Sequence, residues 1–378
     1  MIIFLKKNLY FSLLLFLFAG CKSDTHNKLI IETDSTLTLQ YAKGFTIAYK
    51  DKVKIITVNN PWNSTKPYAR YYLVSDTTTL TPKDGQTIHI PLQKLAVNSG
   101  THFEFIQLIG EINSIKGIAN ASLIYNEHIR KKIEQNELVD MGDPFNMNIE
   151  RIQFLAPDAL MVSGFNQEDP VSKRLIINGT PVIFNNEWME NTLLGRAEWI
   201  KFVAAFYNKE ALSDSIFAQI ATNYLKEKNR ISTIQHKPKV MVGGNFKGTW
   251  YMPGGKSYMA CLLADAGANY FYATDSTSGS LPLNFEVVLA HFRDADYWIG
   301  SQANSREELL ITDQRHGLFS AVAKQQVYNF NQRTSPSGAN DFWESAVARP
   351  DILLKDMIKI FHPEHMQEHN FFFAAKLP

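Results

Sequence analysis

The chain has 378 residues, 45% of them hydrophobic, so it is long enough to form two domains that each bury a core. Its 38 Lys and Arg residues nearly balance its 37 Asp and Glu residues. The basic residues are also spread along the chain rather than clustered, which argues against nucleic acid as the main partner. We therefore expect a two-domain globular protein without a nucleic-acid partner.

The N-terminus has the pattern of an export signal. Two lysines precede a mostly apolar run over residues 9–18, and two small residues and Cys21 follow it. This pattern is typical of a secretory signal peptide, and the run is too short to span a bilayer comfortably. Cys21 resembles the lipidated cysteine of bacterial lipoproteins, although Phe18 stands where Leu is usual. An ordinary signal peptide or anchor is the alternative.

If Cys21 is lipidated, residues 1–20 are removed and the protein sits in the cell envelope, anchored by lipid on the periplasmic side. Only Cys261 then remains, so no internal disulfide can form. Cys261 lies in an apolar run, and we expect it to be a small buried hydrophobe rather than a reactive thiol.

The segment between the signal and Lys94 favours strands. It begins with a polar tether and is then rich in Thr, Val, Ile and Tyr, with turn residues such as Pro61 and Pro67. The stretch GFTIAYKDKVKIITV predicts two strands around a turn. We expect this segment to form a β-rich extension that packs on the domain after it.

After Lys94, short strands alternate with helices in two similar halves. Strands are expected at LAVN, GIA, ALMVSG and PVIFNN in the first half and at KVMVGG and YWIG in the second. This alternation predicts a mostly parallel sheet with helices on both faces in each half. Ligands of such sheets bind outside the carboxyl ends of the strands, so two facing lobes predict a cleft between them.

A proline-free run with helical periodicity joins the halves. Asn208 is expected to separate two helices, and the second, over residues 209–230, should be about 30 Å long. Its predicted buried stripe consists of Leu212, Ile216, Ile220 and Tyr224, with Phe217 and Ala221 beside it.

The expected fold is therefore α/β, with two lobes of mostly parallel sheets bridged by one long helix and a β-rich N-terminal extension. The expected divisions are a signal peptide (1–20), a tether and extension (21–93), an N-terminal lobe (94–208), a bridging helix (209–231) and a C-terminal lobe (232–378).

The two halves share a short internal repeat. NIERIQFLAPDALMVSG, which begins at Asn148, and NFEVVLAHFRDADYWIG, which begins at Asn284, carry the same residues at several offsets. Each copy predicts a short helix with Glu in its first turn, then a turn at Asp and a strand ending in Gly. We interpret the copies as two related lobes, with a chance match as the alternative. The matching pairs are Asn148/Asn284, Glu150/Glu286, Asp158/Asp294, Ala159/Ala295 and Gly164/Gly300.

Aromatic and polar residues gather in the predicted strand-end loops. Aromatic walls with a few cationic and amide groups suit a bulky ligand that is partly anionic or metal-chelated. Packing in the core is the alternative for each aromatic residue, and Arg196 could instead pair with Glu190 or Glu198. The candidate ligand-binding residues are Thr101, His102, Phe165, Trp188, Arg196, Trp250, Tyr251, Arg333 and Trp343.

Other motifs do not predict a site. GGKS at residues 254–257 has Trp250 where a phosphate-binding loop needs glycine. His362, His365 and His369 have metal-like spacing, but no acidic or cysteine ligand is obviously placed, so we expect a solvated terminal turn and no metal site. Hydrolase motifs are also missing, so no catalytic residue is predicted and we do not expect an enzyme.

These residues resemble the class III substrate-binding proteins of ABC importers, which serve ferric siderophores, haem and cobalamin. The resemblance covers roughly residues 94–361. NIERIQFLAPDALMVSG is similar to that family's N-Φ-E-x-x-x-x-L-x-P-D motif, and AVNSGTHFEFIQLIGEINSIKGI to its opening strand, helix and second strand. GRAEWIKFVAAF, GTWYMPGGKSYMACLLADAGANY and NDFWESAVARPDILLKDMIKIFHPE are similar to lipoprotein members from Bacteroidetes-like bacteria. The second repeat departs from the motif, with FRD where the first has APD, and the extension before Lys94 is larger than typical.

The resemblance implies two α/β lobes bridged by one long helix. It also implies that Glu150 and Glu286 dock in arginine pockets of a permease dimer, which a cytoplasmic ATPase drives. The alternative for both glutamates is the helix dipole, which favours Glu in a first turn anyway. The implied ligand is a metal chelate, namely a ferric siderophore, haem or cobalamin, and no resident cofactor is expected.

We thus expect a monomeric, lipid-anchored solute-binding protein that delivers a ferric siderophore or corrinoid to a permease. The alternatives are an envelope metal-chelatase-like or haem-binding protein of the same two-lobe fold, and a structural lipoprotein, which should lack a deep aromatic cleft.

Overall fold

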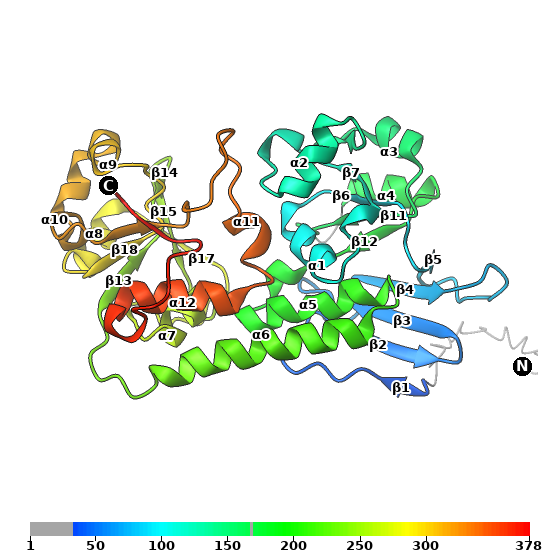
Figure 1. Cartoon of the computed structure of the whole chain (residues 1–378), viewed down its shortest axis with the longest axis horizontal. Coiled ribbons are helices and arrows are strands. Elements are labelled where there is room, and N and C mark those ends of the chain that lie inside the picture. Colours follow the sequence, from blue (N-terminus) through cyan, green and yellow to red (C-terminus); the bar gives the residue numbers. More distant parts are fainter. Residues whose placement is uncertain (1–32, 167–168) are drawn as a thin grey trace, which may run out of the picture. The chain divides into compact units, whose positions relative to one another are not determined.

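The computed structural model of the chain describes residues 33–166 and 169–378, so Cys21 and the signal segment lie outside the described residues. The described part contains two α/β lobes, an additional N-terminal sheet and a pair of helices that runs along both lobes (Figure 1). This architecture agrees with the predicted fold class. Within the described ranges, no helix combines the length and the apolar character needed to cross a membrane.

The predicted β-rich extension is a five-stranded sheet with the order β1-β2-β3-β4-β5. Neighbouring strands are antiparallel except β4 and β5, which are parallel. The stretch GFTIAYKDKVKIITV forms β2 and β3 as predicted, around a turn at Asp51. The strands are β1 (Ser35–Thr36), β2 (Phe45–Lys50), β3 (Val53–Val58), β4 (Ala69–Val74) and β5 (Gln86–His89).

Two buried glutamates tie this N-terminal sheet to helix α5 (Leu193–Ala205). The backbone N–H groups of residues 40–42 donate to the Glu198 carboxylate, and those of residues 43 and 44 donate to Glu190, over 2.7–3.1 Å. A buried carboxylate is stable only with such partners, and removing the sheet would take away most of the donors of both glutamates, leaving Lys201 for Glu198 and the Trp199 indole for Glu190. The sheet is therefore an integral part of the folded body.

The first lobe is built on a fully parallel sheet with the order β12-β11-β6-β7-β8. On β11, Ala159 and Met161 belong to the main core, whereas Leu160 and Val162 belong to a second core on the other face. Burial of both faces explains the uninterrupted apolar run ALMV. The strands are β6 (Leu95–Val97), β7 (Ile115–Ile118), β8 (Val139–Asp140), β11 (Ala159–Val162) and β12 (Val182–Phe184).

Helices cover this sheet on both sides, and two short strands form a hairpin at its edge. The helices are α1 (Phe103–Leu108), α2 (Glu127–Glu134), α3 (Ile149–Leu155) and α4 (Pro170–Ile177), with single 3₁₀ turns at Gly100–His102, Ile112–Ser114, Ala121–Leu123 and Glu187–Met189. The hairpin strands are β9 (Gly142–Asp143) and β10 (Asn146–Met147).

The second lobe repeats the parallel design, with the order β16-β13-β18-β19-β20, and only β20 is antiparallel to its neighbour. The strands are β13 (Lys239–Val242), β16 (Asn269–Tyr270), β18 (Tyr297–Ile299), β19 (Val327–Asn329) and β20 (Ala375–Lys376). The helices are α7 (Tyr258–Asp265), α8 (Phe285–Phe292), α9 (Arg306–Thr312), α10 (Ser320–Ala323), α11 (Phe342–Ser345) and α12 (Pro350–Phe361), with 3₁₀ turns at Gln314–Leu318 and Pro363–His365.

Residues 245–251, expected as a strand-end loop, form a hairpin instead. β14 (Asn245–Phe246) pairs with β15 (Thr249–Pro253), which also pairs with β17 (Ser280–Leu283). The intervening Lys247 and Gly248 both have positive φ, +50° and +89°, as the favoured two-residue hairpin turn requires. The expectation was wrong because Lys is an unusual residue at the first position of this turn.

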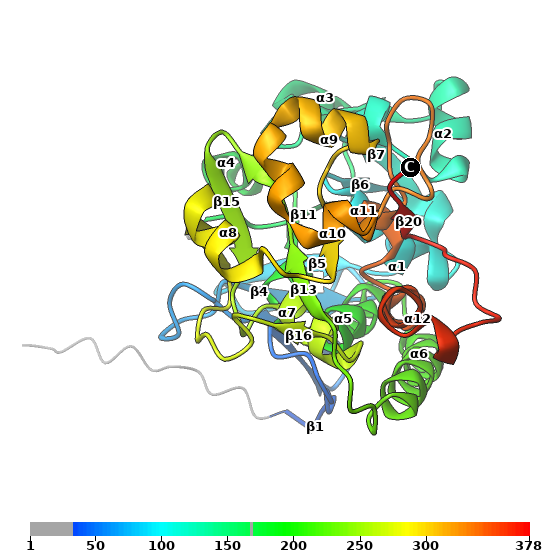
Figure 2. The same cartoon turned by 90° about the vertical axis from the view of Figure 1, so that its left-hand side faces the viewer.

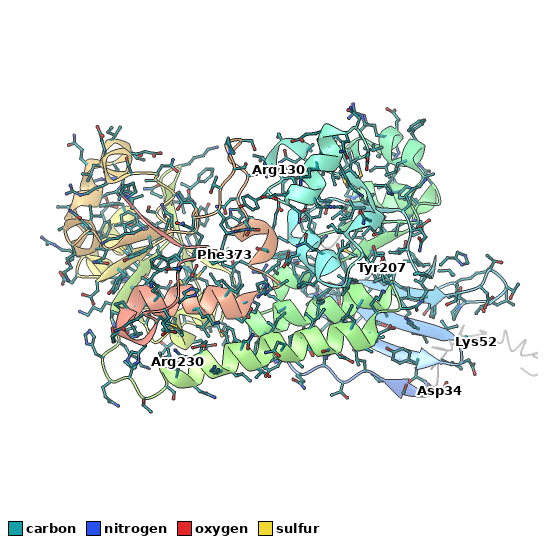
Figure 3. The ribbon with its side chains drawn as sticks, in the orientation of Figure 1. Asp34, Lys52, Arg130, Tyr207, Arg230 and Phe373 are labelled. Carbon is teal, nitrogen blue, oxygen red and sulfur yellow. The ribbon has the colours of Figure 1, made fainter. Side chains whose placement is uncertain are left out.

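The helix pair α5 and α6 (Glu210–Arg230) joins the lobes, with the predicted break at Asn208, whose φ is +58°. α6 packs against α5 and against α12 of the second lobe, and α6 and α12 lie side by side in Figures 1 and 2. Figure 3 shows Arg230, the last residue of α6, below the second lobe. At 21 residues, α6 is about 31 Å long, so it reaches along both lobes.

The buried face of α6 differs from the predicted stripe. Leu212 is exposed and Ile216 is only partly buried, because the flanking helices α5 and α12 cover a neighbouring arc of the helix. The buried residues are Ser213, Phe217, Ile220, Ala221, Tyr224 and Glu227.

The internal repeat begins identically in both lobes. The Asn148 side chain caps α3 by accepting the Arg151 N–H at 2.9 Å, and Asn284 caps α8 by accepting the Val287 N–H at 2.9 Å. Each cap is followed by a glutamate in the first helical turn.

Beyond these helices, the sequence pairing of the repeat is out of register by two residues. Asp158 accepts the Lys94 N–H at 2.8 Å, and the residue that does the same in the second lobe is Asp296, which accepts the Lys239 N–H at 2.9 Å. The second copy has two more residues between its asparagine cap and its strand. The pairs Asp158/Asp294, Ala159/Ala295 and Gly164/Gly300 are therefore wrong as structural equivalents.

Candidate functional site

A cavity of about 310 Å³ lies between the two lobes. Its first-lobe wall comes from the segments that follow β6, β11 and β12, and its other walls come from helices α5, α7, α11 and α12. The lining residues are Ser99, Thr101, Ser163, Phe165, Glu187, Trp188, Leu193, Arg196, Tyr258, Phe342, Trp343, Ala346, Val347 and Leu353. The first-lobe wall thus lies at the carboxyl ends of parallel strands, where ligands of such sheets are expected to bind, and helices provide the other walls.

Aromatic side chains from both lobes line this cavity. Phe165 and Trp188 belong to the first lobe, with ring centroids 6.2 Å apart, and Phe145 extends the row at 4.9 Å from Phe165. Trp343 faces them from the second lobe and is 64% exposed. The exposed rings offer apolar, flat surface to a ligand. The predicted candidates that line the cavity are Thr101, Phe165, Trp188, Arg196 and Trp343.

The N-terminal sheet supports the loop that carries Phe165. The Tyr68 hydroxyl, next to β4, donates to the carbonyl oxygen of Asn166 at 2.9 Å, and the Trp188 indole N–H donates to the Gly164 carbonyl at 3.2 Å. A Cβ atom on Gly164 would lie 2.7 Å from the Tyr68 hydroxyl oxygen, so only glycine allows this approach. The extension therefore takes part in shaping the cavity.

One buried ion pair lies in the cavity wall. Arg196 Nη2 is 3.3 Å from Glu187 Oε1, with side chains that are 14% and 1% exposed, and Glu187 Oε2 accepts the Trp188 N–H at 2.7 Å. The guanidinium carbon of Arg196 also lies 4.5 Å from the ring centroid of Tyr258. Arg196 thus pairs with Glu187, rather than with Glu190 or Glu198, which bind the N-terminal sheet.

His102 lies behind the cavity wall and not on its surface. Its side chain is fully buried, and its Nε2 atom is 3.3 Å from the hydroxyl oxygen of Ser163, which does line the cavity. Burial lowers the pKa of His102 to about 4, so the imidazole is neutral at neutral pH. His102 can position Ser163, but it brings no positive charge to the site.

Trp250 and Tyr251 lie in the second lobe away from the cavity. Successive residues of a strand face opposite sides, so on β15 Trp250 is 0% exposed and Tyr251 is 50% exposed. The Trp250 ring packs 5.4 Å from Trp298, and its indole N–H donates to the Val242 carbonyl at 2.9 Å. Trp250 is thus a core residue, the alternative that we gave for each aromatic candidate.

Arg333 lines a second pocket, of about 450 Å³, which α11 separates from the cavity. There its Nε–H donates to Asp341 Oδ2 at 2.6 Å, and burial raises the pKa of Glu104 in the same pocket to about 7. The pocket is polar and is lined by Glu104, Gln107, Tyr125, Asn126, Glu127, His128, Lys131, Arg333, Asp341, Ser345, Arg349, Ile352 and Phe372.

The C-terminal histidines make separate structural contacts. His362 is buried against the Gly267 carbonyl at 3.1 Å, and His369 Nε2 lies 2.6 Å from Asp356 Oδ1, so the expectation of a solvated turn holds only for His365. In residues 33–166 and 169–378, no group of three or more His, Cys, Asp or Glu side chains is arranged to hold a metal ion. Burial raises the pKa of Cys261 to about 11, which keeps it a protonated thiol.

The two candidate docking glutamates lie outside the cavity. Glu150 and Glu286 are exposed in the first turns of α3 and α8, one on each lobe. Glu286 differs in that its Oε1 atom is 3.3 Å from Arg315 Nη1, a residue whose guanidinium also pairs with Asp313.

Several residues that line the cavity are not among the ligand-binding candidates. Glu187 lies in the predicted strand-end loop that also carries Trp188, and Ser163 directly follows β11, so both lie where ligands of parallel sheets bind. Tyr258 and Leu353 lie on helices and reach the cavity only because α5, α7 and α12 pack together. No local sequence signal marks such residues.

Comparisons with known proteins identify the family. A family model described as "Periplasmic binding protein" matches residues 95–334. An uncharacterized lipoprotein of Methanocaldococcus jannaschii is 26% identical over 93% of this chain and 88% of its own length.

Solved structures share the fold at low identity. A possible iron-binding, periplasmic solute-binding protein from Staphylococcus epidermidis has a TM-score of 0.55 at 16% identity, covering 72% of this chain and 99% of its own. A periplasmic heme-binding protein from Pseudomonas aeruginosa has a TM-score of 0.56 at 16% identity, covering 76% of this chain and 98% of its own. The predicted fold class and resemblance are thus confirmed, and the family and these neighbours are solute-binding proteins rather than enzymes. Since the family model matches well over half of its residues, the chain belongs to the periplasmic binding protein family.

Proposed function

We propose that the protein is the lipid-anchored solute-binding component of an ABC importer and that it captures a ferric siderophore or a corrinoid in the inter-lobe cavity. The observation that carries this proposal is the meeting of aromatic rings from both lobes, Phe165 and Trp188 on one side and Trp343 on the other, around one cavity. Large flat ligands gain contact area from such rings, and a few polar groups fix their orientation.

Delivery requires a surface separate from the ligand site. Glu150 and Glu286 provide one exposed carboxylate on each lobe, and α6 packs along both lobes. A bridging helix of this length restrains the span between the lobes, so both carboxylates can engage a two-fold permease together. Two linked contacts bind more tightly than either alone, because the second forms at a high effective concentration.

Haem is the second candidate ligand, favoured by one specific residue. Tyr258 lines the cavity beneath the Arg196 guanidinium, and a tyrosine oxygen is an established axial ligand of haem iron. The chelatase alternative lacks support, because the family consists of solute-binding proteins. The structural-lipoprotein alternative does not account for the aromatic cavity.

Titration of the purified protein tests the proposal. Ferric siderophores, cyanocobalamin and haemin should be added separately while intrinsic tryptophan fluorescence is followed, because Trp188 and Trp343 line the cavity. Saturable quenching by a siderophore or the corrinoid supports the primary proposal, and quenching by haemin alone supports the second candidate. If none of the three quenches, the metal-chelate class is wrong.

A further inference from the structure

The charges in the wall of the inter-lobe cavity cancel each other. Among the lining residues in the described ranges 33–166 and 169–378, Glu187 and Arg196 are the only acidic and basic ones, and they form an ion pair at 3.3 Å. The Glu187 side chain is 1% exposed, so its carboxylate is shielded from bulk water. The described part of the cavity wall therefore carries no net charge, and its one cation is already paired.

Three neighbouring side chains, His102, Arg333 and Arg349, do not add a free positive charge. His102, behind the wall, is neutral at neutral pH because it is fully buried. Arg333 and Arg349 line the polar pocket across α11, where Arg333 is bound to Asp341 at 2.6 Å and Arg349 lies 3.5 Å from Asp351. Arg333, the second-lobe cation among the ligand-binding candidates, is thus already paired in another pocket.

Apart from this ion pair, the polar side chains of the described cavity lining are uncharged hydrogen-bonding groups. Ser99 and Thr101 place their hydroxyl oxygens 2.9 Å apart, and Ser163 adds a third hydroxyl. Arg196 carries further N–H donors besides the one that Glu187 accepts. Such donors suit neutral carbonyl oxygens, which hydroxamate groups and carboxamide groups both present.

We propose that this cavity selects electroneutral chelates whose surface carries amide-type carbonyl oxygens and that it discriminates against polyanionic chelates. The proposal rests on the proposed function and narrows it to a ligand class. A polyanionic ligand would leave water for a wall whose one cation is already paired, so no free charge of the described wall would offset its desolvation. A neutral ligand can accept hydrogen bonds from the hydroxyls and from Arg196 without that desolvation cost.

Binding of defined chelates by calorimetry tests the selectivity. The probes are ferrichrome, a neutral ferric trihydroxamate; cyanocobalamin, a neutral corrinoid; and ferric enterobactin, a trianionic tris-catecholate. We expect at least one neutral probe to bind at least about tenfold more tightly than the catecholate, which corresponds to about 1.4 kcal/mol. Binding of ferrichrome would indicate that the cavity recognises hydroxamate groups, and binding of cyanocobalamin would indicate that it recognises carboxamide groups.

A charge-removing variant identifies the cause of the selectivity. Glu187→Gln keeps the size of the side chain and leaves the Arg196 cation unpaired, so it should raise the affinity for the catecholate relative to that for the neutral probe by about tenfold. Glu307→Gln, at an exposed site in the first turn of α9, is the matched control and should change neither affinity.

The outcomes separate this inference from the function on which it rests. If the catecholate binds as tightly as the neutral probes, or if Glu187→Gln does not shift the affinity ratio toward the catecholate, the selectivity is overturned while chelate capture stands. If no metal chelate of either class binds, the proposed function fails and the selectivity fails with it.

Discussion

The carboxylate of Glu344, on α11 of the second lobe, accepts the backbone N–H of Asn126, in the first lobe, at 2.8 Å. Its other oxygen accepts the N–H of Tyr125, so one buried side chain binds two donors across the boundary between the lobes. Glu344 belongs to the helix that also carries Trp343 into the cavity. The hydrogen bonds between the lobes and the second-lobe wall of the cavity therefore both depend on α11.

Glu344→Gln should remove a pH-dependent part of the stability. Burial raises the pKa of Glu344 to about 7, above its ordinary value of 4.5. The folded state therefore holds the proton more tightly, and this group's contribution to stability is present below pH 4.5 and lost as pH rises through 7. We expect the wild type to lose stability relative to Glu344→Gln between pH 5 and pH 8.

Urea unfolding of both proteins at several pH values measures this difference. Glu104, whose pKa burial also raises to about 7, and His102, whose pKa burial lowers to about 4, titrate in both proteins and cancel in the comparison. A difference that stays constant across this pH range would show that Glu344 does not titrate as described.

Tryptophan substitutions should separate the cavity from the core. Trp188→Ala and Trp343→Ala should each weaken ligand binding by about 1–3 kcal/mol, because both rings line the cavity. Trp250→Ala should instead destabilise the fold by about 3–5 kcal/mol, since its ring is fully buried, and should leave the affinity of the folded fraction intact. Ligand titration and thermal unfolding of each variant measure the two effects. A loss of ligand affinity in Trp250→Ala without a loss of stability would contradict the placement of Trp250 in the core.

Tyr68→Phe should show that the N-terminal sheet supports the binding loop. The change removes the hydrogen bond to Asn166, but it keeps the ring that packs 4.8 Å from Phe184. A lost hydrogen bond corresponds to about 0.5–1.5 kcal/mol, so we expect a fewfold loss of ligand affinity with little change in melting temperature. Tyr72→Phe is the matched control, because its hydroxyl binds Asp84 within the same sheet. Equal affinity losses in both variants would argue against a local effect on the loop.

The double change Glu150→Ala with Glu286→Ala should abolish transport while ligand affinity stays intact. Both carboxylates are exposed and lie outside the cavity, so neither contacts ligand. Each single change should have a smaller effect, because the other contact remains. Uptake into proteoliposomes with the cognate permease and titration of the purified variant measure the two functions. Uptake at the unmutated rate, or loss of ligand affinity, would contradict the docking role. The favourable interaction of a first-turn glutamate with the helix dipole would then explain both residues.

Cys21→Ser should release the protein from membranes without changing its melting temperature. Cys21 lies outside the described residues, and the proposed anchor depends on its lipidation. Fractionation of cells that express the variant measures the release. A variant that remains with the membrane fraction would contradict lipid anchoring at Cys21.

Much of the fold could be predicted because its signals are local. The apolar run ALMV, the helix break at Asn208 and the alternation of GFTIAYKDKVKIITV each act within a few residues and predict the elements that form. The two asparagine caps also identify equivalent helices in the two lobes. The repeat failed only after α8, where two additional residues shift the register and move the equivalence from Asp294 to Asp296.

The site was harder to predict because it depends on contacts between distant segments. Sequence places Trp250 and Tyr251 together, but only the pairing of β15 with β14 and β17 decides which ring is buried. Likewise, Arg196 could pair with any of several glutamates, and its partner follows from the way Glu190 and Glu198 bind residues 40–44. Tyr258 enters the cavity through helix packing, for which no motif exists.

Native mass spectrometry of the protein purified from its source tests the central claim, capture of a metal chelate, most directly. We predict a retained small molecule with the mass and isotope pattern of an iron or cobalt chelate. The same experiment on the variant that combines Trp188→Ala and Trp343→Ala should show that molecule lost or strongly reduced, because both rings line the cavity. A retained ligand without metal, or a chelate retained equally by the variant, would contradict the claim.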